Sequence, residues 1–342
     1  MISFNNDYSE GACQPIIDNI IKTNYVQAAG YEEDLFCKHA EKIIKEKIEH
    51  EDVDVHFVPG GTPANILAIS LLKPYEAVIC ADTGHINVHE TGSIEATGHK
   101  ILTAKNVDGK LLPNDIEEIV NKHTDEHMVK PRMVFITNST ELGTVYSKKE
   151  LQDIANVCKN NNLYLYLDGA RIGNALVSKN NDLTLKDIAD LTDMFYIGGT
   201  KNGALLGEAM IIKNKDLKEN FRYFIKQHGF LLAKGRIIGI SFITLFENNL
   251  YYKLADKANT MAQLLKVIFK QNGIEFYVDS PTNQIFPILD NDLIKKIKEK
   301  YIVSDWCKYD DNKTVVRFVC SWATKKEFIK AFKDDFESFI KK

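Results

Sequence analysis

Residues 163–171, with the sequence LYLYLDGAR, carry the clearest structural signal in the chain. The run 163–167 is short and apolar, which predicts a buried β-strand, and it is followed at once by the carboxylate of Asp168. Ligands of open parallel sheets bind beyond the carboxyl ends of the strands, so we expect Asp168 at the edge where a site would form. A purely structural ion pair between Asp168 and Arg171 accounts for the two charges equally well.

Similar short apolar runs lie on both sides of this stretch and alternate with helical patterns. Ser147 and Glu150 have the spacing of a capping box at the start of one predicted helix. Strands that alternate with helices predict an α/β fold in which helices cover both faces of a mostly parallel sheet. The other predicted strands are 53–58, 77–80, 133–137, 194–197 and 209–212, and the predicted helices are 63–72, 114–122 and 147–160.

The pattern changes after Gly235. Residues 237–271 are largely helical with an interruption at 247–250, and predicted strands and helices then follow in mixed order. We expect a large α/β domain over residues 1–246, with an N-terminal arm of about residues 1–14, and a small α+β domain over residues 247–342. The predicted strands of the small domain are 275–278, 284–289 and 315–320, and its later helices are 292–300 and 325–340.

The composition is that of an ordinary soluble globular protein. The 342 residues include 43 Lys and Arg against 47 Asp and Glu, a net charge of −4, and 44% are hydrophobic. This balance excludes a nucleic-acid-binding protein that works by bulk positive charge. The six cysteines form no CxxC pair, the N-terminus lacks the features of a signal peptide, and no apolar run has the length of a membrane helix. We expect a cytoplasmic protein with neither a nucleic acid nor a membrane as partner.

Two glycine-rich loops follow other predicted strands. Residues 59–62, PGGT, precede a helix, and the free N–H groups at a helix N-terminus favour a phosphate. A plain strand-to-helix turn is the simpler alternative. Residues 198–203, GGTKNG, place Lys201 between glycines at the end of a buried strand, where a lysine suits Schiff-base chemistry or anion binding.

Together these loops meet the requirements of pyridoxal 5'-phosphate. This cofactor needs a lysine for its aldehyde, an acid opposite its pyridine nitrogen, a cradle for its phosphate and a flat group over its ring. Lys201, Asp168 and the pair Gly61 and Thr62 fit the first three requirements. His85, which ends the sequence DTGH just after a strand, fits the fourth. We expect an amino acid as the small-molecule substrate.

The order of four motifs resembles the threonine aldolase / β-eliminating lyase family of fold-type-I pyridoxal-phosphate enzymes. The motifs are GGTPAN at 60–65, TGHINVHE at 83–90, YLDGAR at 166–171 and GGTKNG at 198–203. The likeness runs from FNND at 4–7 to VVRFVCSWAT at 315–324. It implies cleavage of L-threonine or L-allo-threonine to glycine and acetaldehyde. It also implies a homodimer or homotetramer whose subunits share active sites.

The resemblance implies roles for the residues around the cofactor. Lys201 matches the Schiff-base lysine, Asp168 the partner of the pyridine nitrogen, and His85 the residue stacked on the ring. Gly61 and Thr62 match the phosphate turn. Thr200, before the lysine, is implied to reach the phosphate as well.

Four further residues are implied to reach the substrate or a neighbouring subunit. Arg171 matches an arginine near the cofactor oxygen and the substrate carboxylate, and Arg317 matches the main carboxylate-binding arginine. Tyr31 lies in a segment that enters the site of the adjacent subunit. Lys226 falls where the family often carries a phosphate-binding arginine from the partner chain.

The sequence departs from the family pattern at four positions. Asn6 stands where the family commonly has a serine that binds the substrate carboxylate. Glu32 replaces a glycine, and Lys226 replaces an arginine, which keeps the charge but loses the planar fork. Glu141 replaces a second active-site histidine that faces the substrate side chain. Glu141 is therefore a candidate base for the substrate hydroxyl beside His85.

Other functions stay open at this point. A β-eliminating lyase acting on another amino acid, or an aldolase for a bulkier β-hydroxy amino acid, would use the same cofactor site. A metal could bind His85 with His89, or His123 with His127, but neither spacing is the HExxH motif and we expect no metal. A non-catalytic member of the fold would bind the cofactor and transform no amino acid.

Overall fold

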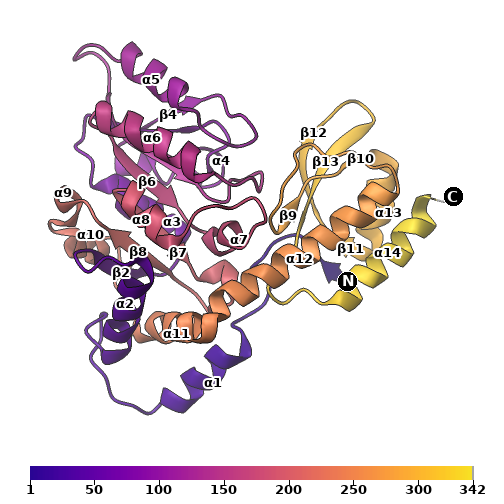
Figure 1. Cartoon of the computed structure of the whole chain (residues 1–342), viewed down its shortest axis with the longest axis horizontal. Coiled ribbons are helices and arrows are strands. Elements are labelled where there is room, and N and C mark those ends of the chain that lie inside the picture. The colour runs from indigo at the N-terminus through magenta and orange to yellow at the C-terminus, as the bar shows by residue number, and fades with distance from the viewer. Residues whose placement is uncertain (341–342) are drawn as a thin grey trace.

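The large part of the molecule is built on a seven-stranded β-sheet (Figure 1). The computed structural model describes residues 1–340. β8 runs antiparallel to both of its neighbours, and the other neighbouring strands are parallel, so the expected α/β fold with a mostly parallel sheet is confirmed. In spatial order the strands are β2 (Asp54–Val58), β8 (Glu208–Ile212), β7 (Met194–Gly198), β6 (Tyr164–Asp168), β5 (Lys130–Thr137), β3 (Glu76–Ala81) and β4 (Lys100–Ala104).

The side chains of each strand alternate between two apolar clusters, one on each face of the sheet. In β6, Leu165 and Leu167 belong to the first cluster and Tyr166 to the second. The first cluster includes residues of α1 (Gln14–Thr23), α2 (Leu35–Ile48), α5 (Pro113–Lys122), α6 (Lys148–Asn160), α8 (Leu185–Leu191) and α11 (Arg236–Phe246). The second includes residues of α3 (Gly61–Ser70) and α10 (Phe221–Gln227).

Polar side chains begin three of these helices, and at α8 Thr184 and Asp187 form a capping box. At α6 the Ser147 hydroxyl accepts the N–H of Glu150, and the Glu150 carboxylate accepts the N–H of Ser147, so the predicted capping box is confirmed. At α2 the Asp34 carboxylate accepts the N–H of Cys37 at 2.8 Å. Each cap stabilises the helix that it begins by about 1 kcal/mol.

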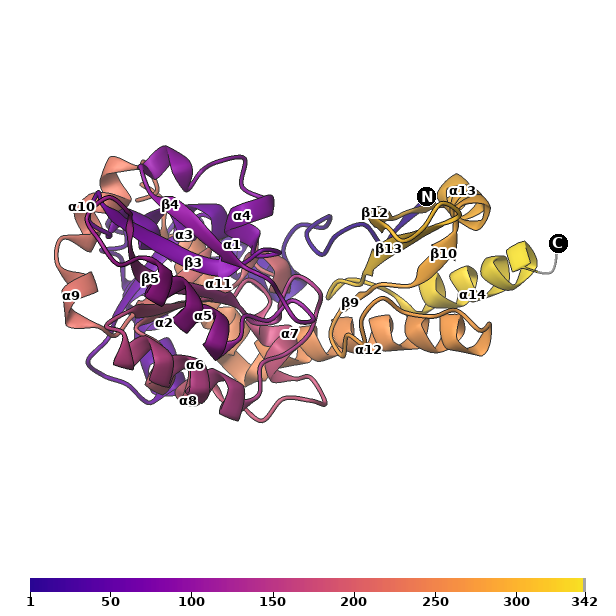
Figure 2. The same ribbon diagram turned by 90° about the horizontal axis from the view of Figure 1, so that it is seen from above.

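The smaller part of the molecule packs antiparallel strands against three helices. Figures 1 and 2 show α12 extending from the large part beneath these strands. The pairing of β1 (Ile2–Ser3) with β11 (Tyr301–Ile302) joins the first residues of the chain to this part. The remaining strands are β9 (Gln284–Ile285), β10 (Ile288–Asp290), β12 (Ser304–Lys308) and β13 (Lys313–Val319), and the helices are α12 (Leu250–Gln271), α13 (Asn291–Lys300) and α14 (Lys326–Ile340).

Several elements differ from the expectations. Residues 275–278 do not form a strand, and an isolated bridge joins Phe276 to Pro287 instead. The expected strand 284–289 is divided into β9 and β10, since Pro287 has no N–H to donate to a ladder. The apolar pattern does not reveal β4, β12, α1 or α2, because charged and polar residues interrupt it.

The helical region 237–271 is interrupted where the sequence indicates. α11 ends at Phe246, the turn η3 (Glu247–Asn249) follows, and α12 begins at Leu250. The domain boundary at 246/247 stays a prediction. Among the described residues, no helix is both long and apolar enough to cross a membrane. The short elements are α4 (His85–Val88), η1 (Glu95–Thr97), α7 (Ile172–Leu176), η2 (Thr200–Asn202) and α9 (Lys215–Lys218).

Candidate active site

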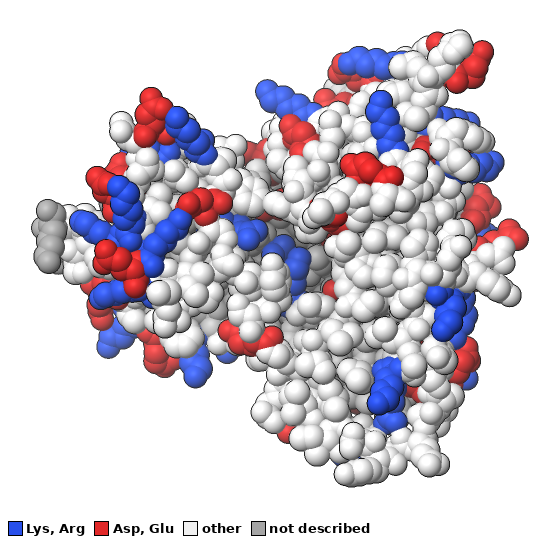
Figure 3. All heavy atoms as spheres, turned by 180° about the vertical axis from the view of Figure 1, so that it is seen from behind, with Lys and Arg blue, Asp and Glu red and all other residues white. Residues whose placement is uncertain are grey.

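A cavity of about 460 Å³ lies at the edge of the large sheet where the parallel strands have their carboxyl ends. Figure 3 shows a hollow between the two parts of the molecule, with lysine and arginine atoms inside it. The residues of the sequence analysis that line the cavity are Gly61, Thr62, His85, Glu141, Asp168, Arg171, Thr200, Lys201 and Arg317.

Asp168 is the last residue of β6, and its buried carboxylate accepts three hydrogen bonds. The Tyr196 hydroxyl donates to Oδ1 at 2.5 Å, and the backbone N–H of Ala170 donates to the same oxygen at 2.9 Å. Asn65 Nδ2 donates to Oδ2 at 3.2 Å. Since an ionised carboxylate only accepts hydrogen bonds, this surrounding suits an anion in a fixed orientation.

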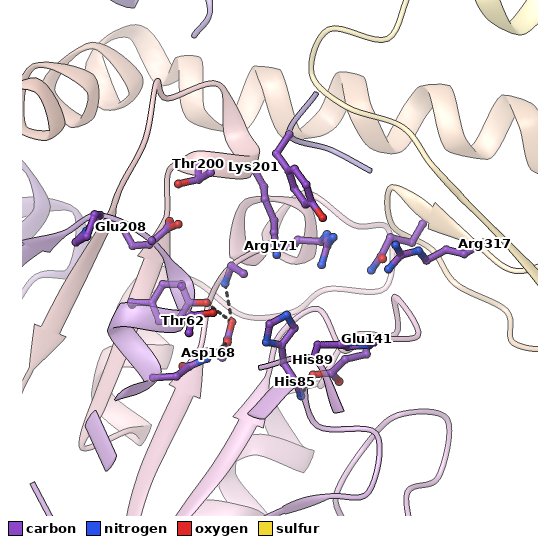
Figure 4. A pocket seen from close by; sticks show the side chains of 18 of the residues that line it. Thr62, His85, His89, Glu141, Asp168, Arg171, Thr200, Lys201, Glu208 and Arg317 are labelled. Carbon is purple, nitrogen blue, oxygen red and sulfur yellow. Dashed lines mark hydrogen bonds between the residues drawn. The ribbon is translucent and has the colours of Figure 1, made fainter. Parts of the chain in front are cut away.

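Lys201 lies on η2, shortly after β7, and lines the cavity. Figure 4 shows Lys201 and Arg171 on one side of the pocket, with Asp168, His85 and Glu141 on the opposite side. Burial, together with the positive charge of Arg171, lowers the pKa of Lys201. The amine is therefore biased toward its unprotonated, nucleophilic form.

The N-terminus of α3 lines the cavity beside Asp168 and Lys201. The first turn of a helix leaves N–H groups without intrahelical partners, and those of Gly61 and Thr62 lie in the lining of the cavity. A Cβ on Gly61 would approach the Tyr196 hydroxyl to 2.9 Å, so a side chain here would fill the cradle. The Thr200 hydroxyl lies at the same cavity. The donor set fits a ligand with an anionic phosphate and an electrophilic carbonyl.

His85 is the first residue of α4 and is held at two points. Its backbone N–H donates to Glu141 Oε1 at 2.8 Å, and its ring Nδ1 lies 2.8 Å from Glu90 Oε1. Glu141 follows β5, and its Oε2 accepts from the Thr137 hydroxyl at 2.9 Å. Burial raises the pKa of Glu141. The residue that replaces the family histidine therefore supports His85 as well as facing the cavity.

Arg171 is paired within the chain. Its Nε and Nη2 donate to the two carboxylate oxygens of Asp7 at 2.6 and 3.1 Å, and Asn283 Nδ2 donates to Asp7 Oδ2 at 2.9 Å. Burial alone would raise the pKa of Asp7, but the charges of Arg171 and Lys201 and these hydrogen bonds hold it below its ordinary value. Asp7 thus fixes Arg171 and occupies two of its donors.

Arg317, on β13, has fewer partners. Its buried Nε has none among the described residues, and Nη2 donates to the carbonyl of Asn5 at 3.4 Å. Burial and the nearby Arg171 guanidinium lower the pKa of Arg317, so a bound anion would be favourable here. Gln284 is also buried, and both polar atoms of its amide lack a partner within residues 1–340. Because Gln284 pairs with Val319 across the strands, it lies on the same face as Arg317.

Three predicted site residues lie outside this cavity. The Asn6 amide oxygen accepts the backbone N–H of Tyr8 at 3.0 Å and the hydroxyl of Ser9 at 2.9 Å. Tyr31 and Lys226 contact each other instead, with Nζ 4.4 Å from the ring centroid. The roles that the family resemblance gives these three residues stay predictions.

Sequence reasoning gave His89 a role only in the metal alternative, and it gave no role to six other residues of the cavity wall, namely Tyr8, Asn65, Tyr196, Glu208, Gln284 and Trp306. Glu208 opens β8 at the cavity, and burial raises its pKa to about 7. The sequence signal that could have identified Glu208 is an acidic residue directly before the buried apolar run 209–212. His89 lies beside His85, with 5.4 Å between the ring centroids. In the part of the chain that the structure describes, no group of three or more His, Cys, Asp or Glu is arranged to hold a metal.

Known proteins are similar to this chain in sequence and in fold. A family model described as beta-eliminating lyase matches residues 12–291. The low specificity L-threonine aldolase of Pseudomonas sp. (strain NCIMB 10558) is 34% identical over 345 residues, which cover 98% of this chain and 97% of that relative. The structure of Leishmania major threonine aldolase is 47% identical, with a TM-score of 0.98, and the match covers 99% of this chain and 100% of that chain.

A more distant structure carries the same fold. The histidinol-phosphate aminotransferase from Clostridium acetobutylicum is 14% identical with a TM-score of 0.75, covering 99% of this chain and 98% of that chain. With the Leishmania structure it confirms the expected fold-type-I architecture. Since the family model covers most of the chain and the Pseudomonas relative nearly all of it, the chain belongs to the beta-eliminating lyase family.

Proposed function

We propose that this chain is a pyridoxal-phosphate-dependent lyase that cleaves the Cα–Cβ bond of L-threonine or L-allo-threonine to give glycine and acetaldehyde. The proposal rests on Lys201, which faces the carboxylate of Asp168 across a cavity that the N-terminus of α3 also lines. Membership of the beta-eliminating lyase family and the names of the relatives support the same reaction.

Five residues would hold the cofactor. Lys201 would carry it covalently at its aldehyde carbon, and Asp168 would face its pyridine nitrogen. The N–H groups of Gly61 and Thr62 and the hydroxyl of Thr200 would take the phosphate. When bound, pyridoxal phosphate accepts the electron pair that a breaking bond leaves at Cα.

Four further residues that line the cavity would bind and orient the amino acid. Arg317 Nε has no partner among the described residues, and a guanidinium binds a carboxylate through two parallel hydrogen bonds. Arg171, held by Asp7, would add positive charge beside it. His85 would take the proton of the β-hydroxyl, and Glu141 is a second candidate base because a raised pKa makes a carboxylate more basic.

We also propose a homodimer or homotetramer whose subunits complete one another's sites. Tyr31 and Lys226 are distant in sequence, lie outside the cavity of their own chain, and still meet at one surface. A second copy seated on that surface would receive both side chains together. The six unpaired cysteines support a reducing, cytoplasmic location.

The direct test is to incubate the cofactor-loaded protein with L-threonine and L-allo-threonine and to quantify glycine and acetaldehyde together. We expect equimolar products, no turnover in Lys201→Ala, and normal turnover in the control Lys213→Ala, which alters a half-buried lysine elsewhere. Pyruvate and ammonia from another amino acid would identify a β-eliminating lyase instead. Bound cofactor without any product would contradict an enzymatic role.

Glu141→Gln tests the second candidate base. The substitution keeps the shape of the side chain but removes its ability to take a proton near neutral pH. If Glu141 is the base, turnover falls by about 100-fold or more. Unchanged turnover would remove Glu141 from the chemistry and leave His85 as the base.

A further inference from the structure

Glu90 lies directly behind His85, and the reaction proposed above gives it no role. Its side chain is fully buried. Its Oε1 lies 2.8 Å from His85 Nδ1 and accepts from Asn65 Nδ2 at 2.6 Å, while its Oε2 accepts from the Ser93 hydroxyl at 2.9 Å. Three neighbours therefore fix the orientation of this carboxylate.

The contact with Glu90 determines which ring nitrogen of His85 carries hydrogen. An ionised carboxylate only accepts hydrogen bonds, so Nδ1 must be the donor. In the neutral ring the lone pair then lies on Nε2. Nε2 makes no hydrogen bond to any described residue, and the His85 side chain is 32% exposed in the lining of the cavity. The basic nitrogen is therefore open to a ligand.

Asn65 ties this pair to Asp168. Its Nδ2 donates both to Glu90 Oε1 and, at 3.2 Å, to Asp168 Oδ2. Its Oδ1 accepts from the Tyr166 hydroxyl at 2.8 Å. The acid expected to face the pyridine nitrogen and the acid behind His85 are thus held at a fixed separation by one buried amide.

We propose that Glu90 is a positioning residue that holds His85 in the Nδ1–H tautomer, so that Nε2 takes the proton of the substrate β-hydroxyl. The Glu90 charge then stabilises the imidazolium that forms. This inference rests on the proposed function. As the O–H bond breaks, a bond forms between the proton and Nε2. The O–H electron pair becomes the second carbon–oxygen bond of the aldehyde, while the Cα–Cβ bond breaks and leaves its electron pair at Cα. Cα then takes up a proton and becomes the CH₂ group of glycine.

The kinetic test is Glu90→Gln, which keeps the shape and one acceptor but removes the charge. We expect kcat to fall about 10- to 100-fold with KM within twofold, and the acid limb of the kcat–pH profile to move to lower pH. The matched control is Glu76→Gln. Glu76 is a buried glutamate at the start of β3, outside the cavity, and it accepts the N–H of Lys73 at 2.9 Å. In a His85→Gln background, Glu90→Gln should cause no further loss, because Glu90 acts through His85.

A second measurement needs no substrate and separates the two proposals. In cofactor-loaded protein with ¹⁵N-labelled histidine, NMR should show His85 as the Nδ1–H tautomer. The Nε2–H tautomer, or Glu90→Gln kinetics equal to those of Glu76→Gln, would overturn the inference. If Glu90→Gln does not fold, the wild-type tautomer still decides. An Nδ1–H tautomer in a protein that cleaves no β-hydroxy amino acid would refute the proposed function while supporting the positioning of His85.

Discussion

The two halves of the cavity are built in opposite ways. In the half formed by the large sheet, the Asp168 carboxylate accepts three hydrogen bonds, and Asn65 joins it to Glu90. In the half formed with the small part of the molecule, Arg317 Nε and the Gln284 amide have no partner among the described residues. An unpaired buried polar group costs about 1–3 kcal/mol, so the second half gains its missing hydrogen bonds when a ligand arrives.

In the first half the protein itself orients the charged and polar groups, whereas in the second half the substrate must supply the missing hydrogen-bond partners. Dipoles and charges that are already oriented need no rearrangement during a reaction, which is the condition for strong electrostatic catalysis. Donors without partners instead give affinity and orientation to an incoming carboxylate. Substitutions in the first half should therefore lower kcat, and substitutions in the second half should raise KM.

The largest expected effect follows from Asp168→Asn, which removes the charge at the centre of the first half. The amide keeps an acceptor for Tyr196, so the fold should persist while kcat for L-threonine falls about 1,000-fold. Asp193→Asn is the control, because Asp193 accepts the N–H of Leu165 at 2.8 Å outside the cavity. A loss below 10-fold, measured by steady-state kinetics, would show that this carboxylate is not the main electrostatic partner of the cofactor.

The first half was also the more predictable from sequence. Asp168, Lys201 and Gly61 follow strands whose carboxyl ends meet at one edge, and this rule alone brings them together. Glu208 escapes the rule because β8 is antiparallel and reaches the same edge with its first residue. Tyr196 has the pattern of a core residue inside a strand, and nothing in that pattern indicates that its hydroxyl donates to Asp168.

The second half depends on contacts that sequence patterns do not encode. Gln284 lies in a strand of two residues that ends before Pro287, and Trp306 lies in a strand without an apolar pattern. Asp7 meets Arg171 only because the start of the chain packs with the small part of the molecule. The family resemblance supplies Arg317 as a substrate residue, whereas the residues alone favour a surface charge.

Glu208→Gln tests how much the buried acid of the first half destabilises the folded protein, through the pH dependence of the free energy of unfolding. Because burial raises the pKa of Glu208 from 4.5 to about 7, the folded protein holds a proton that the unfolded chain releases between these values. The wild type therefore loses stability as pH rises from about 4.5 to 7, by roughly 3 kcal/mol from this group. Glu208→Gln should not show this loss. Urea unfolding of cofactor-free protein at pH 5 and pH 8 measures it, and parallel pH dependence in both proteins would contradict it.

Arg317→Lys tests the second half by replacing the planar fork with a single ammonium group. The charge stays, but the two parallel hydrogen bonds to a carboxylate are lost, so KM for L-threonine should rise about 30-fold with little change in kcat. The control Arg132→Lys alters an arginine that hydrogen-bonds to the Tyr164 hydroxyl at 2.9 Å, outside the cavity. Should kcat fall while KM stays constant, Arg317 would belong functionally to the first half.

Gln284→Met gives the smallest and most discriminating effect. Methionine has a similar shape but no amide, so it removes two buried polar atoms that have no partner in the described part of the chain. If those atoms bind the substrate, KM should rise about 10-fold, while the free energy of unfolding stays equal or increases by about 1 kcal/mol. Gln263→Met is the control, because the Gln263 amide nitrogen donates to the carbonyl of Thr282 at 3.0 Å. This variant protein should be less stable than the wild type, with unchanged KM. A Gln284→Met protein that is less stable, with unchanged KM, would mean that the amide supports the fold. Arg317 would then be the residue of the second half whose missing hydrogen bond a ligand supplies.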